Sequence, residues 1–222
     1  MDKSQRFIPY EFEAVSESEM IDRASKNYQF VNKRRSIRHF SDRDVPLEVM
    51  QNIIMSAGTA PSGAHKQPWT FCLIGNPEQK KAIREAAEKE EYENYHGRMS
   101  EEWLKDLEQF DTDWHKEFLE TVPWIIVIFK KSYDMSADGK MKNYYVNESV
   151  GIACGMLINA IHNAGLATLT HTPSPMNFLH KLLDRPDNER PFLLLPVGYP
   201  ANECEVPNIK RKSFEEICVM FD

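Results

Sequence analysis

The 222-residue sequence has little positive charge and no long apolar run. Lysine and arginine together number 27, against 34 aspartates and glutamates, which gives a net charge of −7. Because phosphate binding needs a basic face, this balance argues against nucleic acid as the main partner. The longest apolar block, residues 124–129, is much shorter than the roughly 18 residues of a membrane span, so we expect no membrane partner.

Cysteine is scarce, and the amino-terminal residues carry no export pattern. The four cysteines at positions 72, 154, 204 and 218 form no Cys-x-x-Cys pair. Residues 1–10 lack the positive-then-apolar arrangement of a signal peptide. Both features favour a cytoplasmic location, where thiols stay reduced.

Signatures of several enzyme classes are also missing. No Gly-x-Gly-x-x-Gly follows the first predicted strand, and no phosphate-binding P-loop is found, which argues against a dinucleotide Rossmann site and a P-loop enzyme. Without His-x-x-x-His pairs or cysteine clusters of zinc spacing, we expect no metal site. The absence of Gly-x-Ser-x-Gly removes support for a hydrolase elbow.

Hydrophobic spacing and capping residues predict a single domain of long helices and few strands over residues 1–222. Helices are expected over residues 19–33 with Ser18 as cap, 46–57, 77–95, 100–122, 146–164 and 176–183, with a short terminal helix after the capping box Ser213-x-x-Glu216. Buried strands are expected over residues 69–74, 124–130, 167–172 and 192–199, and the polar residues 133–143 are expected to be mobile. This order is typical of an α+β or α/β sheet covered by helices. The polar segment 200–222 is longer than one core requires, which suits an arm that wraps a partner subunit.

Three segments could carry chemistry. Arg34, Arg35, Ser36 and Arg38 offer three guanidiniums and a hydroxyl that could hold a phosphate, although a solvated basic helix end is the plainer interpretation. The small residues 61–64 would let a backbone approach a planar ligand, or form an ordinary turn. The threonine alternation over residues 168–172 is also normal for a half-polar strand.

Taken together, these motifs resemble the nitroreductase superfamily of flavoproteins. Arg-Arg-Ser-Ile-Arg, Thr-Ala-Pro-Ser-Gly-Ala-His before Gln-Pro-Trp, and Pro-Val-Gly-Tyr-Pro before Lys-Arg-Lys occur in similar order and spacing. Within the superfamily, residues 91–99, Trp-His-Lys-Glu at 114–117 and residues 194–200 look like the iodotyrosine deiodinase subgroup. The resemblance implies a central mixed or antiparallel sheet covered by long helices, in an intertwined homodimer with a C-terminal arm.

The resemblance also implies FMN as cofactor, bound at the dimer interface. Arg34, Ser36 and Arg211 would bind its phosphate, Arg35 would contact the same region, and Arg38 would reach the N1/O2 edge of the flavin, where a cation stabilises developing negative charge. Pro61 and Ser62 would come from the partner chain. Thr170, His171 and Thr172 would line the flavin, with the Thr172 hydroxyl near N5, where it would favour one-electron steps.

A substrate clamp follows from the same resemblance. Glu91 would pair with the ammonium of an amino-acid zwitterion, Lys116 with its carboxylate, and Tyr95 would add a hydroxyl. The backbone N–H of Ala64 would hold the phenolate oxygen, and residues 88–117 would form a lid. From spacing alone, Glu91 is one acid in an exposed acidic face. Simple hairpin geometry about Gly97 does not bring Lys116 opposite it.

The implied activity is reductive dehalogenation of halotyrosines to tyrosine and halide, with Thr172 and Arg38 as catalytic residues. Mono- and diiodotyrosine are the expected substrates, with bromo- and chlorotyrosine as further ones, and NAD(P)H or a reductase would supply electrons. A broad nitroreductase or quinone reductase of the same fold is the alternative, and it would not need the clamp. The second alternative is a protein that binds flavin or halotyrosine without catalytic turnover. The departure at His171, where vertebrate members carry threonine, could alter redox tuning.

Overall fold

The computed structural model describes residues 7–137 and 139–221, which divide into two units at Arg34. The first unit contains helix α1 (Glu17–Asn32), whose cap is Ser16 and not the expected Ser18. The Ser16 hydroxyl accepts a hydrogen bond from the Glu19 N–H at 3.3 Å, so the helix begins two residues earlier than predicted. No residue of α1 is buried within the structure described.

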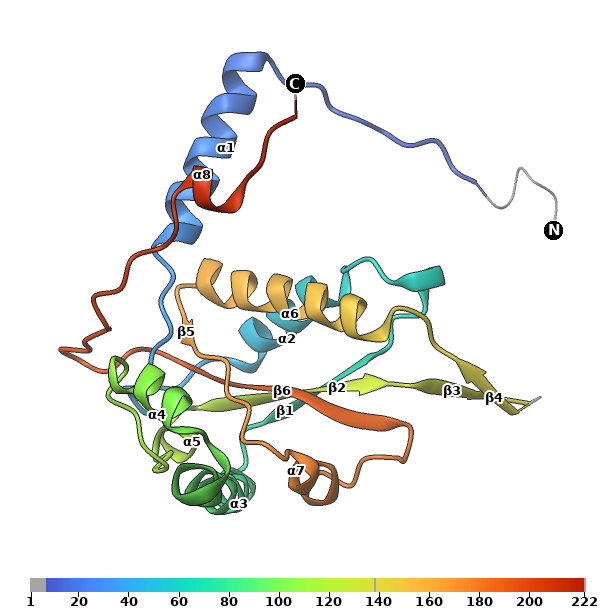
Figure 1. The fold of residues 1–222 in the computed structure, drawn as a ribbon. Helices are drawn as coiled ribbons and strands as arrows, with labels where there is room; N and C mark the ends of the chain where they lie inside the picture. The colour runs from blue at the N-terminus through green and yellow to red at the C-terminus, as the bar shows by residue number, and fades with distance from the viewer. Residues whose placement is uncertain (1–6, 138, 222) are drawn as a thin grey trace. The chain divides into compact units, whose positions relative to one another are not determined.

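The second unit is built on an antiparallel sheet, which is one of the two sheet types that the family resemblance implies. Its strands are β1 (Trp69–Ile74), β2 (Trp124–Lys131), β5 (Ala167–Thr168) and β6 (Glu189–Gly198), in the order β1-β2-β6-β5. Each neighbouring pair is antiparallel, and Figure 1 shows β2 and β6 at the centre. The antiparallel sheet with its covering helices therefore confirms the α+β class.

Helices cover both faces of this sheet (Figure 1). Helices α2 (Leu47–Gly58) and α6 (Val146–Asn163) pack on one face against Ile126 and Ile128 of β2. Helices α3 (Pro77–Glu93), α5 (Phe118–Thr121) and α7 (Asn177–Leu182) lie on the other, where the core contains Ile125, Val127 and Phe129 of the same strand. Both faces of β2 are buried, which accounts for the unbroken apolar run over residues 124–129, and each fully buried side chain of this run contributes about 1.5–3 kcal/mol to folding.

Several predicted ends are confirmed by their local chemistry. Asn76 caps α3 by accepting from the Gln79 N–H, with Pro77 at the first helical position. Gly165 follows α6 with φ +76°, the left-handed conformation that glycine adopts without strain. Ser213 and Glu216 form the expected capping box of α8 (Phe214–Ile217).

The predicted long helix over residues 100–122 is wrong. Within this range only α4 (Glu101–Glu108) and the four-residue α5 are helical, and the chain between them leaves helical geometry, with Asp111 in a left-handed conformation at φ 44°. Lys116 therefore lies in a turn and not on a helix. The helix over 77–95 also ends early, because residues Asn94–Arg98 form a wider π-helical turn.

Two strand predictions also need correction. Strand β5 ends at Thr168, and only His171 makes a further bridge, with Leu194. Residues 133–143, where no strand is predicted, contain a hairpin of β3 (Tyr133–Ser136) and β4 (Gly139–Lys142). Among the described residues, no helix combines the length and apolar character needed to cross a bilayer.

Candidate functional site

A cavity of about 810 Å³ opens beside the start of the second unit. Its wall is formed by three segments: Ser36 and residues 38–40, residues of the segment 109–121, and Ala201 with residues 205–207. This volume lies within the range of about 300–1,000 Å³ usual for ligand sites. The cavity therefore combines the arginine motif with part of the predicted lid.

Arg38 places a half-buried positive charge in the wall of this cavity. Its guanidinium is half-buried and lies 5.4 Å from the centre of the Phe110 ring. Within the part of the chain that the structure describes, it makes no ion pair or hydrogen bond. Burial lowers the pKa of Arg38, and the nearby Tyr95 phenol raises it in part. A half-buried guanidinium without an anionic partner is suited to an anionic edge of a ligand.

The arginine motif is held beside the strand that leads to the threonines. The Ile37 N–H donates to the Thr168 carbonyl at 3.2 Å, and Ser36 forms a parallel bridge with Thr168. Beyond Thr168, the side chains of Thr170 and Thr172 are exposed and alternate with buried His171. The two hydroxyls are therefore available to a ligand on one side of this segment.

The His171 side chain points into the protein, away from the exposed side of Thr170 and Thr172. It is 6% exposed and meets the Phe118 ring edge-on at 5.9 Å between centroids. Its Nε2 has no hydrogen-bond partner among the described residues, and burial lowers the pKa to about 3, so the imidazole is neutral. A role of this side chain in lining a flavin stays a prediction.

The structure does not bring all the predicted phosphate ligands to this cavity. The Arg35 guanidinium donates to the Pro207 carbonyl, which fixes the C-terminal segment at the cavity wall. Arg211 is exposed and does not line the cavity. Arg34 is the last residue of the first unit. Their shared phosphate site stays a prediction.

The loop after α2 presents a free backbone donor. Gly63–His65 forms a single 3₁₀ turn in which Ala64 is left-handed, at φ 49° and ψ 32°. The Ser62 hydroxyl accepts from the Gln67 N–H at 2.9 Å, and the Ser149 hydroxyl accepts from the Gly63 N–H at 3.3 Å. No acceptor for the Ala64 N–H is found in the described residues. Pro61 and Ser62 lie outside the cavity lining.

Glu91, Tyr95 and Lys116 come together. The Lys116 Nζ lies 3.8 Å from Glu91 Oε2 and 5.7 Å from the centre of the Tyr95 ring. Glu91 is 8% and Lys116 4% exposed, so the interpretation of Glu91 as part of an exposed acidic face is wrong. The Tyr95 hydroxyl donates to the Thr112 carbonyl at 3.2 Å, which connects this trio to the cavity wall.

Burial dominates the electrostatics of the trio. It raises the pKa of Glu91 and lowers the pKa of Lys116, in each case against the attraction of the other residue. The Tyr95 pKa is also raised, first by burial. Both charges are thus incompletely compensated, and a zwitterion would offer each of them an opposite charge.

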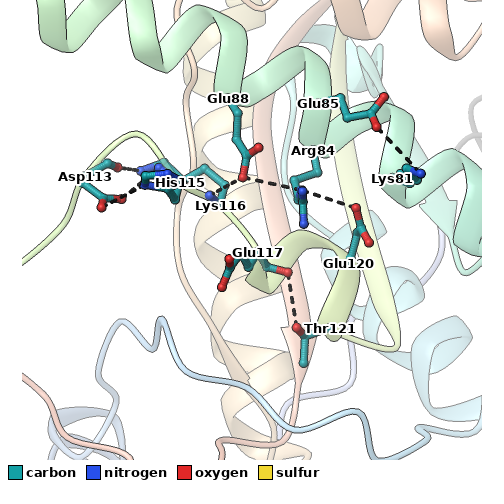
Figure 2. Close-up of polar contacts among 10 residues, drawn as sticks. All are labelled: Lys81, Arg84, Glu85, Glu88, Asp113, His115, Lys116, Glu117, Glu120 and Thr121. Atoms are coloured by element: carbon teal, nitrogen blue, oxygen red, sulfur yellow. Dashed lines mark hydrogen bonds and ion pairs between the residues drawn. The ribbon is translucent and has the colours of Figure 1, made fainter.

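Sequence reasoning missed the residues that hold Lys116. Figure 2 shows the Glu88 carboxylate on α3 accepting from the Lys116 N–H at 2.7 Å, close to Arg84 and Glu120. Glu88 stands in a charged run on α3 whose letters do not single it out. Among the described residues, no group of three or more His, Cys, Asp or Glu could hold a metal ion.

Known proteins resemble this chain along nearly its whole length. The nitroreductase family model matches residues 31–199. An iodotyrosine deiodinase of Haliscomenobacter hydrossis is 58% identical over 222 residues, all of both chains. The human iodotyrosine deiodinase 1 is 48% identical over 214 residues, which cover 96% of this chain and 74% of the human one.

A solved structure resembles the fold as well. The crystal structure of an oxidized iodotyrosine deiodinase bound to FMN and 3-iodo-L-tyrosine superposes with a TM-score of 0.74 at 28% identity. It covers 88% of this chain and 98% of that chain. A nitroreductase with bound FMN from Bacteroides fragilis, 15% identical with a TM-score of 0.66, has the same fold.

Proposed function

This chain belongs to the nitroreductase family, and we propose that it is an FMN-dependent iodotyrosine deiodinase. The proposed reaction converts 3-iodotyrosine, one proton and two electrons to tyrosine and iodide, and 3,5-diiodotyrosine reacts twice. Bromo- and chlorotyrosine are proposed as further substrates. The observation that carries the proposal is the buried Glu91–Lys116 ion pair. The Lys116 ammonium of this pair also lies against the Tyr95 ring, near the cavity that Arg38 lines.

The residues present are suited to FMN. Arg38 supplies a half-buried cation for the N1/O2 edge of the flavin, and Ser36 lines the same cavity. We propose that Arg34, Arg35 and Arg211 complete the phosphate site, that Thr170, His171 and Thr172 lie along the ring, and that Pro61 and Ser62 of a partner subunit close it. When bound, FMN would supply the two electrons, and the Thr172 hydroxyl would hydrogen-bond the flavin and favour their transfer one at a time.

The clamp binds the amino-acid group of the substrate by exchanging partners. Glu91 takes the ammonium and Lys116 takes the carboxylate, so the buried pair, whose charges are disfavoured by burial, is replaced by two ion pairs with the substrate. Tyr95 adds its hydroxyl. The exchange favours a zwitterion over a neutral aromatic compound, because the two buried charges must both be satisfied.

The phenolate end is held at the loop after α2. The Ala64 N–H, which has no acceptor in the described residues, donates to the phenolate oxygen, as a backbone donor does in an oxyanion site. The proton is added at the iodine-bearing carbon, and the two electrons then expel iodide and restore the aromatic ring. Residues 88–117 close as a lid that excludes water from the stacked substrate.

The proposal also includes a homodimer and an external source of electrons. We expect a homodimer, because Pro61 and Ser62 lie outside the cavity of their own chain and can serve a second one. Light scattering that finds only a single chain of 25.8 kDa at micromolar protein would contradict the dimer. NAD(P)H or a separate reductase supplies the electrons.

The test mixes dithionite-reduced, FMN-loaded protein with 3-iodotyrosine under anaerobic conditions. Tyrosine release and flavin reoxidation are followed together. One tyrosine per flavin reoxidised is the expected result. Reoxidation by a nitroaromatic compound without any tyrosine from 3-iodotyrosine would instead favour a broad nitroreductase or quinone reductase of the same family.

A further inference from the structure

Glu88 joins the clamp lysine to helix α3. Its Oε1 accepts a hydrogen bond from the Lys116 N–H at 2.7 Å. The same oxygen lies 3.5 Å from Arg84 Nε, which in turn lies 3.3 Å from Glu120 Oε1 on α5. Figure 2 shows these side chains in a row between α3 and the segment that carries Lys116. The Glu88 side chain is 14% exposed, so water competes little for its oxygens.

Lys116 depends on such a contact because it lies outside any helix or strand. Its carbonyl accepts from the Leu119 N–H at the start of α5, and its Nζ donates to the Asp113 carbonyl. The Glu88 bond satisfies the remaining backbone group, and a carboxylate acceptor makes it a strong, charge-assisted bond. The position of the Lys116 ammonium relative to Glu91 therefore depends on Glu88.

We propose that Glu88 is a positioning residue for substrate binding, which holds Lys116 where it can receive the carboxylate of an amino-acid substrate. This inference rests on the function proposed above. Arg84 supports the role by connecting Glu88 to Glu120, so that the turn and α5 keep one position relative to α3. Glu91 binds the substrate directly, whereas Glu88 acts only through Lys116.

The contact is separate from the packing that holds α3 in the fold. Ile83 and Ala87 of α3 are fully buried in the core. The buried Lys80 ammonium donates to the Glu120 and Val122 carbonyls at 3.0 and 2.6 Å, which fixes α5 against α3 independently. Loss of the Glu88 carboxylate should therefore leave the helix pair assembled and release mainly the Lys116 backbone.

The test compares three variants of the full, FMN-loaded protein: Glu88→Ala, Glu88→Gln and Glu85→Ala. Glu85 is the matched control, because it lies on the same helix but forms only an exposed pair with Lys81 at 3.9 Å (Figure 2). Dissociation constants are measured by calorimetry for 3-iodotyrosine and for 2-iodophenol, which lacks the ammonium and carboxylate. Hydrogen exchange of the Lys116 amide is measured without substrate.

We expect Glu88→Ala to weaken 3-iodotyrosine binding about tenfold or more, and to speed exchange of the Lys116 amide. Binding of 2-iodophenol and of FMN should stay as in the parent protein. Glu88→Gln should recover most of the loss, because its amide oxygen can still accept from the Lys116 N–H. Glu85→Ala should change neither the dissociation constants of the two ligands nor the exchange rate of the Lys116 amide.

Two results would overturn the inference. Unchanged iodotyrosine binding in Glu88→Ala would show that Lys116 needs no such support. Equal losses for both ligands would show a general structural effect. A parent protein that binds no 3-iodotyrosine would instead contradict the proposed function, and the amide exchange would still test whether Glu88 holds Lys116.

Discussion

The Lys116 ammonium lies 3.8 Å from the Glu91 carboxylate, although one residue belongs to a turn and the other to the last part of helix α3. Both side chains are almost completely enclosed. A buried pair of this kind contributes little net stability, because the cost of removing both ions from water offsets their attraction. Binding of a zwitterionic substrate gives a reason for keeping it.

Replacement of Glu91 by glutamine is expected to weaken 3-iodotyrosine binding about 10- to 100-fold, because the substrate ammonium loses its counter-charge. FMN binding should persist, since Glu91 lies outside the cavity lining. Thermal denaturation should also show a lower stability, because Lys116 loses its acid partner. Calorimetric titration with each ligand checks the binding.

The control for this variant is Glu93→Gln, an exposed acid two residues further along α3. It removes the same charge from the same helix without touching Lys116, and it should leave iodotyrosine binding unchanged. Equal affinity in Glu91→Gln and the parent protein would remove Glu91 from the clamp.

The sequence predicted the sheet and most helices well because their signals are local. The apolar run of β2, the Asn76-Pro77 start of α3 and the glycine after α6 each carry their own physical cause. The segment after Ser100 misled the prediction, because Trp103, Leu107, Phe110, Trp114 and Phe118 repeat at nearly helical spacing. The chain instead turns at Asp111, and Phe110 and Phe118 line the cavity.

The candidate site could be predicted only in part. Residue types identified Arg38, Glu91 and Lys116 through the family resemblance, but no local pattern contains the contact of Glu91 with Lys116. That contact joins α3 to a segment outside the helices, and the Lys116 N–H also donates to Glu88 of the same helix. Non-local hydrogen bonds of this kind leave no period in the sequence.

Arg38→Leu is expected to reduce FMN affinity about 10- to 100-fold, because the guanidinium is the half-buried cation of the cavity. Stability of the FMN-free protein should not fall, since no ion pair or hydrogen bond of Arg38 with a described residue is lost and its burial is unfavourable. Quenching of FMN fluorescence measures the affinity. Arg43→Leu, which removes an exposed guanidinium 4.0 Å from the Tyr199 ring centre, is the control. Unaltered FMN affinity in Arg38→Leu would exclude the assigned contact.

His171 should make stability depend on pH. Its pKa is lowered from 6.5 to about 3 in the folded protein, so the unfolded chain binds a proton between these values that the folded chain cannot. Stability attributable to His171 is therefore present above pH 6.5 and falls by about 1.4 kcal/mol per pH unit toward pH 3. The decline between pH 6.5 and 5 should be smaller in His171→Leu. Urea unfolding at several pH values measures it, with His39→Leu, at an exposed position, as control.

Gly63 allows the loop after α2, which we propose binds the phenolate, to approach the start of α6 closely. A Cβ at this position would lie 2.9 Å from the Tyr144 carbonyl oxygen, which is too short to be kept, and 3.0 Å from the Tyr145 ring, which would have to move slightly. Gly63→Ala should therefore displace the loop and the adjacent Ala64 N–H. We expect 3-iodotyrosine and 2-iodophenol to lose affinity by similar factors of about ten, because the phenolate contact serves both ligands.

The matched variant is Gly58→Ala, at the end of α2, where an added Cβ would meet nothing within 4 Å. It should keep both affinities and should stabilise the protein slightly, since alanine restricts the unfolded chain more than glycine does. Calorimetric titration with the two ligands separates this site from the clamp. Loss confined to 3-iodotyrosine in Gly63→Ala would assign the loop to the amino-acid end of the substrate, and would contradict the role of Ala64 at the phenolate.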